Sequence, residues 1–542
     1  MPVTHRASRP RILGTAALAA VAVAALAPGQ QAASASSSSE LGFGSKIYVD
    51  QNLAGGEPFV LHPSNGKAAP GRLVYTSHEG TTHLFRDGVL TAPKGTSDFV
   101  TTYRNQVIIW TSDDNGATWK RVDWQGTGFF TNPAVNTGFS DPDLTEDAGG
   151  TIYNTGIDLA NDALFSSPDY GATWPTGTVQ CDQGDRPWLA GGKAHQVFLA
   201  TNVQGGQHTI FESDDSGATC KQLATHPNGD GKLFYDKRTG SLVEPFVSSA
   251  GVGVGVMHPG ETSFTDHLVS AGGIQSHWPS IAIDKGGNYY LTWDTDNRDP
   301  NGTAGCGALP GVAGGATGGP SPLPNSIMLS WSGDGGRTWA KPLTVAHPGT
   351  RVLWPWVTAA DSGHAAVVWY QYDTLTDPDC GTGDISIYAA SLDSFGRSKG
   401  PHVTVTEASH GPIHAGGTCQ GGTTCAATGQ DRRLGDFFTV ATDYRGCLLI
   451  ASGDTMLTDP ITGMQLPTSR PILIRQNHGD GLAGRDCGTS KKKGSGTAAA
   501  GFVLPETPAA PGAGLLLAVA ALGGVALAMT QRRGRRLRAL PA

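Results

Sequence analysis

The stretch Ser112-Asp113-Asp114-Asn115-Gly116-Ala117-Thr118-Trp119 decides the fold, because its pattern returns three more times along the chain. The other copies span 167–174 (SPDYGATW), 213–220 (SDDSGATC) and 332–339 (SGDGGRTW), so the shared form is S-x-D-x-G-x-T-W, with Cys220 once replacing the final tryptophan. In such a pattern the aspartate accepts backbone N–H bonds in a tight turn and the glycine adopts positive φ. Apolar or β-branched residues precede the copies, as at 107–109 and 327–329, which predicts a hairpin turn within a repeated sheet unit.

A longer repeat runs through the same region. Each copy contains a short lead segment, a strand, a glycine-containing turn and a second strand. The copies begin at Glu57, Pro142, Arg186, Leu233, Trp278, Trp354 and Gly435. The spacing of these units is close to that of known propeller repeats. We therefore predict an all-β protein, a β-propeller of seven four-stranded blades, or of six if the first or fourth unit is irregular.

The eight-residue pattern strongly resembles the Asp-box (BNR) repeat of sialidase-type β-propellers. In that family the box lies on the face away from the active site, so the resemblance implies that the box residues are scaffold. If the box joins the third and fourth strands, the first strand of each blade starts on the opposite face and the second strand ends there. The residues predicted on that face are Glu57, His78, Glu79, Asp141, Asp143, Asp158, Asp185, Arg186, Asn202, His277, Asp294, Asp296, Arg351, Tyr370, Tyr372, Asp373, Asp431, Arg432, Arg433, Asp436 and Asp454.

The resemblance also implies roles for some of these residues. In sialidases three arginines bind the sugar carboxylate, a tyrosine activated by a glutamate is the nucleophile and an aspartate is the acid/base. By resemblance, the candidates here are Arg186, Arg351 and Arg433 for the arginine cluster, Arg432, Asp185 and Asp436 as further substrate-binding residues, Asp141 or Asp143 as acid/base, Tyr370 or Tyr372 as nucleophile, and Glu244 as a distant base for the tyrosine. The F/Y-R-I-P signature of the family is absent, since Arg186-Pro187 lacks the intervening residue.

Two functions remain open at this stage. The first is an exo-glycosidase that acts on sialic-acid-type glycans. The second is a non-catalytic propeller that binds a glycan or a protein, for which Trp188, Trp278, Trp354 and Trp356 would suit a sugar or a peptide unless they pack between blades. For either function, the charged residues of the rim could also simply cap loops and pair with one another.

Other chemistries find little support in the sequence. The segment 294–299 (DTDNRD) begins like a calcium loop but has Arg298 at a ligand position, so neither a metal nor a cofactor is expected. The motifs G-x-S-x-G and H-E-x-x-H are absent. The net charge of −8, from 38 basic and 46 acidic side chains, gives no nucleic-acid footprint, so the expected partner is a glycan or glycoprotein.

The two ends of the chain predict display on a cell surface. Residues 1–35 read as a signal peptide, 36–487 as the propeller, 488–512 as a linker, 513–530 as an apolar membrane or sorting helix, and 531–542 as a basic cytoplasmic tail. The segment 504–508 (LPETP) resembles the sortase signal L-P-x-T-G but ends in Pro508. The chain is therefore expected to be anchored in the membrane or in the cell wall.

The eight cysteines fit an oxidising compartment. Their positions favour the pairs Cys306–Cys380, Cys419–Cys425 and Cys447–Cys487. Cys181 and Cys220 remain, and the blade layout puts them at opposite ends of neighbouring strands, so the sequence gives no account of that pair.

Overall fold

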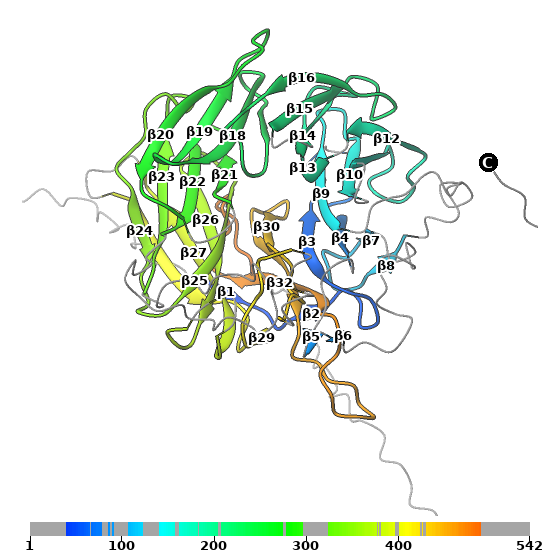
Figure 1. Ribbon diagram of the computed structural model, residues 1–542, viewed down its shortest axis with the longest axis vertical. Helices are drawn as coiled ribbons and strands as arrows, with labels where there is room; N and C mark the ends of the chain where they lie inside the picture. The colour runs from blue at the N-terminus through cyan, green and yellow to red at the C-terminus, as the bar shows by residue number, and fades with distance from the viewer. Residues whose placement is uncertain are drawn as a thin grey trace, which may run out of the picture. The chain divides into compact units, whose positions relative to one another are not determined.

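Seven sheets surround a common centre in the computed structural model (Figure 1). The structure describes residues 40–64, 67–78, 85–86, 89–90, 107–122, 140–157, 162–182, 184–203, 207–274, 278–295, 324–376, 378, 381–395, 400–422, 425 and 430–488. Within these ranges every named element is a β-strand. The prediction of an all-β propeller with seven blades is confirmed.

The first three blades each contain an Asp box. Blade 1 consists of β3 (Gly56–Leu61), β4 (Leu73–His78), β7 (Ile108–Ser112) and β8 (Lys120–Arg121). Blade 2 consists of β9 (Ser140–Glu146), β10 (Ile152–Ile157), β11 (Asp162–Ser167) and β12 (Thr176–Asp182). Blade 3 consists of β13 (Gly184–Gly191), β14 (Val197–Val203), β15 (Gln207–Ser213) and β16 (Lys221–Thr225). A small separate sheet pairs β5 (Phe85–Arg86) with β6 (Val89–Leu90).

Blades 4 to 6 continue the same order of strands. Blade 4 consists of β17 (Phe234–Asp236), β18 (Ser241–Ser248), β19 (Gly251–Met257) and β20 (Thr265–Ala271). Blade 5 consists of β21 (Ser280–Ile283), β22 (Tyr289–Asp294), β23 (Ile327–Ser332) and β24 (Leu343–Ala346). Blade 6 consists of β25 (Val352–Ala359), β26 (His364–Tyr372), β27 (Asp384–Asp393) and β28 (His402–Glu407), and β29 (His414–Ala415) also pairs with β27.

The seventh blade closes the ring with the two ends of the propeller. It contains β30 (Thr439–Thr442), β31 (Leu448–Asp454) and β32 (Arg470–His478), and its outer positions are taken by β1 (Gly42–Phe43) and β2 (Ile47–Tyr48), which both pair with β32. Lys46 fixes this closure, because its ammonium lies 2.9 Å from the buried carboxylate of Asp454. Sequence reasoning missed this closing strand, whose paired segments are only two residues long.

The Asp boxes form one repeated turn between the third and fourth strands. In the first copy the hydroxyl of Ser112 donates to the carboxylate of Asp114 (2.8 Å) and accepts from the N–H of Gly116 (2.8 Å), while Asp114 also accepts from the N–H of Thr118 (2.8 Å). The box glycine packs against the preceding blade: at Gly171, where φ is +84°, a Cβ would lie 2.7 Å from Val74. The boxes are therefore structural, as the resemblance implies.

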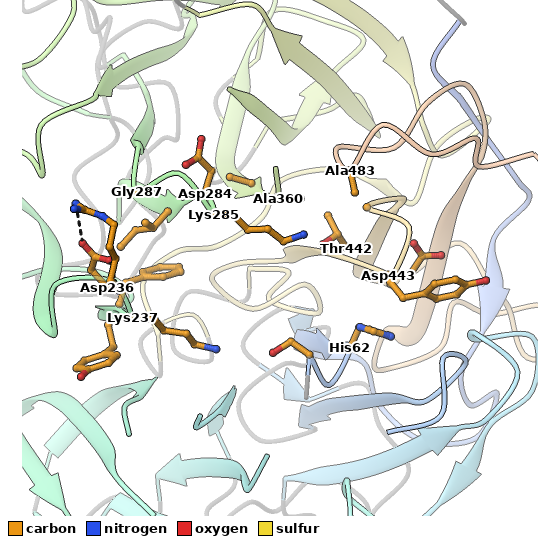
Figure 2. A pocket seen from close by; sticks show the side chains of 18 residues that line it. His62, Asp236, Lys237, Asp284, Lys285, Gly287, Ala360, Thr442, Asp443 and Ala483 are labelled. Carbon is orange, nitrogen blue, oxygen red and sulfur yellow. Dashed lines mark hydrogen bonds and ion pairs between the residues drawn. The ribbon is translucent and has the colours of Figure 1, made fainter. Parts of the chain in front are cut away.

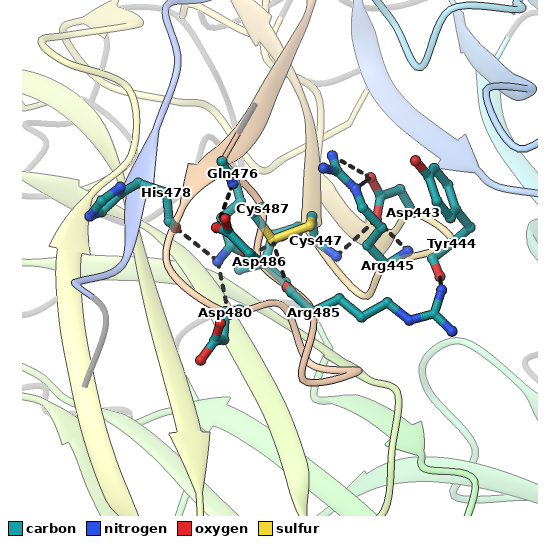
Figure 3. The surroundings of a disulfide bond; sticks show 12 residues. Asp443, Tyr444, Arg445, Cys447, Gln476, His478, Asp480, Arg485, Asp486 and Cys487 are labelled. Atoms are coloured by element: carbon teal, nitrogen blue, oxygen red, sulfur yellow. Dashed lines mark hydrogen bonds and ion pairs between the residues drawn. A yellow bond between two sulfur atoms is a disulfide. The ribbon is translucent and has the colours of Figure 1, made fainter. Parts of the chain in front are cut away.

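Three disulfides lie within the described residues. Cys419–Cys425 and Cys447–Cys487 are confirmed, and Figure 3 shows the second one joining the start of β31 to the segment after β32. Cys181 pairs with Cys220, with a Cα–Cα distance of 5.0 Å, which corrects the layout from the sequence. The reason is the packing between blades 2 and 3, where Cys220 lies against the buried cluster that contains Leu164 and Cys181. Cys306 and Cys380 lie outside the described residues.

The predicted signal, linker, apolar and tail segments also lie outside the described residues. Of the helical structure that the described part of the chain contains, none is long and apolar enough to cross a membrane.

Candidate functional site

Four blades begin with an unusual backbone conformation. Glu57, Asp141, Arg186 and Trp354 each precede a proline and have φ values of 48°, 51°, 60° and 53°. The register of the first two strands shifts at each of these positions, as in a β-bulge. Such a conformation costs about 1–3 kcal/mol for a residue with a side chain, and bulges often re-aim side chains next to functional sites. The repeat thus turns four side chains out of the ladder on the face opposite the Asp boxes.

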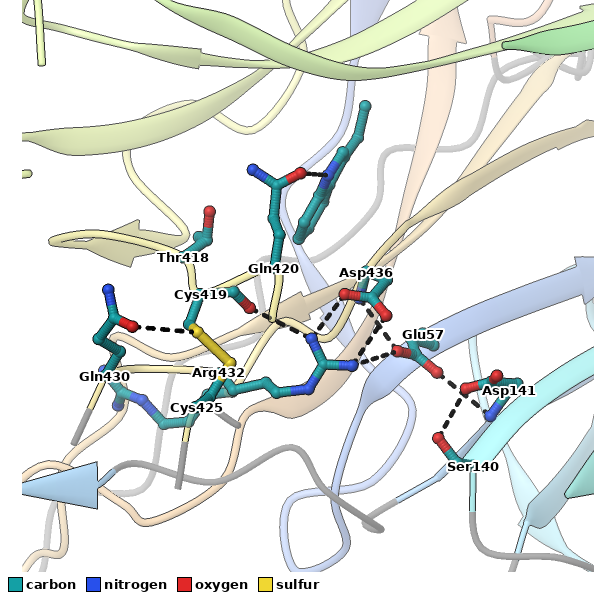
Figure 4. Close-up of polar contacts among 12 residues, drawn as sticks. Glu57, Ser140, Asp141, Thr418, Cys419, Gln420, Cys425, Gln430, Arg432 and Asp436 are labelled. Atoms are coloured by element: carbon teal, nitrogen blue, oxygen red, sulfur yellow. Dashed lines mark hydrogen bonds and ion pairs between the residues drawn. A yellow bond between two sulfur atoms is a disulfide. The ribbon is translucent and has the colours of Figure 1, made fainter. Parts of the chain in front are cut away.

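On this face the first three blades and the seventh bring one group of ionisable residues together. We call it the strand-start mouth, and it comprises Glu57, His78, Asp141, Asp185, Arg186, Asp230, Arg432 and Asp436. Figure 4 shows its central part, with Glu57 between Asp141 and Arg432. Of the eight, Asp141, Asp185, Arg186, Arg432 and Asp436 were predicted site residues.

The centre of the mouth is a pair of carboxyl groups. Glu57 is fully buried, and it bonds the ring Nε2 of His78 (2.6 Å) and accepts from the backbone N–H groups of Asp141 (3.2 Å) and Asp436 (3.0 Å). Its carboxyl group also hydrogen-bonds that of Asp141, which is only partly buried. Burial, and then the charge of Asp436, raises the pKa of Glu57 to about 7. Burial, and then the charge of Glu57, raises the pKa of Asp141 to about 7 as well. One proton shared between two such groups is a common basis of acid/base catalysis.

Arg432 is the buried counter-ion next to this pair of carboxyl groups. Its guanidinium donates to both oxygens of Asp436 (2.5 and 2.8 Å) and to the carbonyl of Cys419 (3.2 Å), and it lies 3.7 Å from Glu57. Gly435 makes the close approach possible, since a Cβ there would lie 2.4 Å from the side chain of Glu57. Arg432 is therefore a structural partner of the carboxyl groups, and its charge is already neutralised.

The outer edge of the mouth is more exposed. Arg186 lies 3.7 Å from Asp185 and 3.8 Å from Asp230, with its guanidinium 5.0 Å from the ring centre of Trp278. The side chain of Asp185 is 57% exposed and that of Arg186 is 31% exposed. Burial, and then the charge of Asp141, raises the pKa of Asp185 to about 6. A ligand in the mouth can reach these two side chains.

A cluster of aromatic rings closes the channel beneath the mouth. Phe59, Trp188, Trp278, Trp356 and Phe437 come from five blades and lie 5.2–6.2 Å apart between ring centres. Each of these side chains is buried, so the tryptophans pack against one another and against rings from other blades.

Asp143 belongs to the channel wall and not to the mouth. It forms an ion pair with Lys232 and accepts from the backbone N–H groups of Leu189 (2.7 Å) and Leu144 (2.6 Å). Lys232 also lies 5.1 Å from the ring centre of Phe59. Of the two aspartates predicted as acid/base, only Asp141 therefore lies in the strand-start mouth.

Both predicted tyrosines are fully buried. The hydroxyl of Tyr370 bonds that of Ser452 (2.8 Å) and its ring stacks on Phe438, while Tyr372 donates to the carbonyl of Pro378 (3.1 Å). Burial raises the pKa of Tyr370. These contacts favour structural roles and give no activated nucleophile.

The three arginines of the predicted cluster lie in different surroundings. Arg433 is bound by Asp431 through three hydrogen bonds of 2.6–3.1 Å and donates to the carbonyls of Thr455 and Leu466. Arg351 is 2% exposed and lies before β25 in blade 6. Arg186 is the one predicted arginine whose side chain reaches solvent.

Glu244, the predicted base for a tyrosine, is instead the centre of a buried chain of polar groups. Its two oxygens bond the rings of His208 (2.6 Å) and His226 (2.5 Å), and His226 continues to Asp266 (2.8 Å). Burial alone would raise the pKa of Glu244, but the two histidines outweigh it and lower the pKa to about 2. Burial alone would lower the pKa of His226, but Glu244 and Asp266 outweigh it and raise the pKa.

This chain predicts a pH-dependent contribution to stability. Because the folded state raises the pKa of His226, its stabilisation is full below the usual histidine pKa and is lost as pH rises through the raised value. We expect His226→Gln to lower the chemical unfolding midpoint strongly at pH 6 and much less at pH 9. His402→Gln, on the exposed start of β28, is the matched control and should show no such difference. An equal loss at both pH values would contradict the prediction.

A cavity of about 830 Å³ opens on the Asp-box face. It lies among the turns between first and second strands, and Figure 2 shows Lys237, Lys285 and His62 around it. Its carboxylates are bonded within the propeller: Asp284 accepts from Tyr290 and Gly363, and Asp236 accepts from Tyr289 and Thr239. The raised carboxyl pKa values are therefore on the other face, where the sequence placed the site.

Three contributors to the strand-start mouth were not assigned roles from the sequence. Glu57 and His78 were placed on the rim without a role, and Asp230 was not considered. A signal for Glu57 exists in the shared dipeptides Glu57-Pro58, Asp141-Pro142 and Arg186-Pro187, which mark equivalent positions of three blades. Among the described residues, no group of three or more His, Cys, Asp or Glu side chains is arranged to hold a metal ion.

Comparisons with known proteins give structural neighbours only. No protein-family model matches the chain, and no curated protein matches it. A protein of unknown function from Dyadobacter fermentans is 13% identical, with 81% of this chain and 100% of that chain covered and a TM-score of 0.39. The intramolecular trans-sialidase from Ruminococcus gnavus is 12% identical (79% and 96% covered, TM-score 0.35), and the structure of YCF48 bound to D1 peptide is 13% identical (80% and 99% covered, TM-score 0.38). The chain is thus similar to sialidase-like and other propellers, and its own seven blades and four Asp boxes establish the fold.

Proposed function

We propose that the protein is a glycan-processing propeller that cleaves a glycosidic bond at the strand-start mouth, with Asp141 as the general acid. The observation that carries the proposal is the pair Glu57–Asp141, in which both pKa values are raised to about 7. A general acid works best when its pKa lies near the pH of the reaction. Asp141 is the accessible member of the pair, so it is the one that can reach a leaving oxygen.

The other residues of the mouth support this role. Glu57 is held by His78 and by two backbone N–H groups, so it acts as a positioning residue that keeps a proton on Asp141. Asp185 on the next blade is exposed and, with its pKa raised to about 6, could activate a water molecule as a base. Glycosidases commonly divide acid and base work between two carboxyl groups in this way.

The sialic-acid-type substrate implied by the resemblance depends on Arg186. A sugar carboxylate would have to draw this guanidinium away from Asp185 and Asp230, because Arg432 and Arg433 are committed to internal carboxylates. A sialoside is therefore the reference ligand of the test. The proposal also retains surface display by the predicted signal peptide and anchor, which fractionation of cells producing the full chain would check.

One observation favours a second candidate, a propeller that binds a glycan without cleaving it. Among the described residues the two candidate nucleophiles, Tyr370 and Tyr372, are buried and hydrogen-bonded away from the mouth. Incubation with a panel of fluorogenic glycosides, together with direct binding measurements, separates the two functions. Turnover supports the first candidate, whereas binding without turnover of any panel member supports the second.

The pH profile of turnover gives a sharper test. The reaction needs protonated Asp141, so activity should fall as pH rises through about 7. Glu57→Gln removes the charge that helps to raise the pKa of Asp141, so this fall should move to lower pH. Glu261→Gln, in an exposed turn between β19 and β20, is the control and should keep the wild-type profile. A profile unchanged by Glu57→Gln would rule out the proposed pair.

A further inference from the structure

The arginines of the strand-start mouth have little positive charge to offer a ligand. Arg432 is 3% exposed, and its terminal nitrogens are hydrogen-bonded to both oxygens of Asp436. A ligand carboxylate could take this place only by leaving Asp436 and Glu57 as buried carboxyl groups without their counter-ion, which is costly. The neighbouring Arg433 is fully buried and paired with Asp431.

The accessible charges are mainly negative. Arg186 shares its single positive charge with Asp185 and Asp230, which lie 3.7 and 3.8 Å away. The side chain of Asp185 is 57% exposed, which exceeds the 31% of Arg186, and that of Asp230 is 30% exposed. Asp141, which lies beside them and is also partly exposed, adds no positive charge. At neutral pH this edge therefore attracts cations and repels carboxylates.

The aromatic ring beneath this edge also favours a cation. Trp278 lies under Arg186 and contacts Trp188, with 5.5 Å between ring centres. The face of an indole ring attracts cations, as the position of Arg186 itself illustrates. The edge thus already holds one cation, with the ring of Trp278 beneath it and the carboxylates of Asp185 and Asp230 beside it.

We infer that the sugar bound at the strand-start mouth carries a free amine, and that the ligand is a glycan ending in a deacetylated amino sugar. Its ammonium group would donate to Asp185 and Asp230. The inference rests on the proposed function in taking the ligand to be a glycan, and it adds the charge of the sugar. It does not depend on turnover, because recognition by these carboxylates needs no bond cleavage.

Binding of matched oligosaccharides to the full chain tests this inference. The probes are a glucosamine tetramer, its fully N-acetylated form, and a tetrasaccharide of the same length that ends in sialic acid. We expect the amine form to bind about tenfold more tightly than the other two at low salt, with a preference that shrinks as ionic strength rises. Tighter binding of the sialylated probe, or equal binding of all three, would overturn the inference.

Two variants locate the recognition. Asp185→Asn should reduce the preference for the amine over the N-acetylated form about fivefold, and Asp230→Asn should have a similar effect. Asp214→Asn, equally exposed but in the third Asp box, is the matched control and should leave the preference unchanged. If both variants keep the wild-type preference for the amine over the N-acetylated form, these carboxylates do not bind the amine.

The outcomes of the turnover and binding measurements distinguish a failure of the proposed function from a failure of this inference. If the amine form binds best but no glycoside is cleaved, the inference stands and the hydrolytic step of the proposed function falls. If a sialoside is cleaved in a reaction that needs Asp141, the proposed function stands and the inference falls. If none of the glycans binds, both are wrong.

Discussion

Asp141→Asn is expected to lower kcat on the glycoside that the wild-type protein cleaves by a factor on the order of 10²–10⁴, with the Kd for that glycoside changed by only a few-fold. The asparagine keeps the size of the side chain and can still bond Ser140, which donates to Asp141 at 2.7 Å. It cannot deliver a proton to a leaving oxygen. Steady-state kinetics and a binding measurement on the same variant check the two halves of this expectation.

Asp114→Asn is the matched control for that substitution. Asp114 lies in the first Asp box, where it bonds Thr118 and Ser112 on the far face. We expect it to affect stability modestly and to leave kcat unchanged. Retention of more than a tenth of the wild-type kcat by Asp141→Asn would remove Asp141 from the role of general acid.

Arg432→Met is expected to reduce the free energy of unfolding by about 3–5 kcal/mol, because it leaves buried carboxyl groups without their counter-ion. The loss concerns Asp436, which accepts two hydrogen bonds from Arg432, and Glu57, whose pKa Arg432 holds down. Without the arginine, the pKa of Glu57 should rise further. Chemical unfolding at pH 5 and pH 8 measures the effect, which should be larger at pH 8, where the carboxyl groups must be charged.

A double variant and a surface control complete this test. Arg432→Met combined with Asp436→Leu should recover part of the lost stability, since an apolar pair can replace a buried ion pair. Arg337→Met, in the exposed part of the fourth Asp box, should change the unfolding free energy by less than about 0.5 kcal/mol. A loss below about 1 kcal/mol for Arg432→Met would mean that the ion pair contributes little to the fold.

The sequence was sufficient for the architecture because the relevant signals are local and repeated. The Asp boxes fix the hairpins, and the spacing of units such as Pro142 and Pro187 predicts the number of blades. Blade 4, which like blades 6 and 7 has no box, was predicted from the repeat unit that begins at Leu233. Alternation of strand direction then predicted the face on which Asp141, Asp185 and Arg186 lie.

The chemistry of the site could be predicted only in part, because it depends on side-chain pairing. Asp431, Arg432, Arg433 and Asp436 form two separate ion pairs, and nothing in their spacing says which charges are left for a ligand. Tyr370 and Tyr372 are two residues apart and therefore share one face of β26, but periodicity does not say that this face is the packed one. Contacts across blades, such as Glu57 with Asp141, join residues 84 positions apart.

The closure of the ring by residues 42–48 has a consequence for the order in which the protein can form. These residues are synthesised before the first blade, yet they pair with β32, which is among the last parts of the propeller to be synthesised. During synthesis the growing chain carries an unpaired edge while six blades form, and the ring closes only when the final blade is complete. An arrested or shortened product would remain an open arc, so completeness of the chain is itself a condition for maturation.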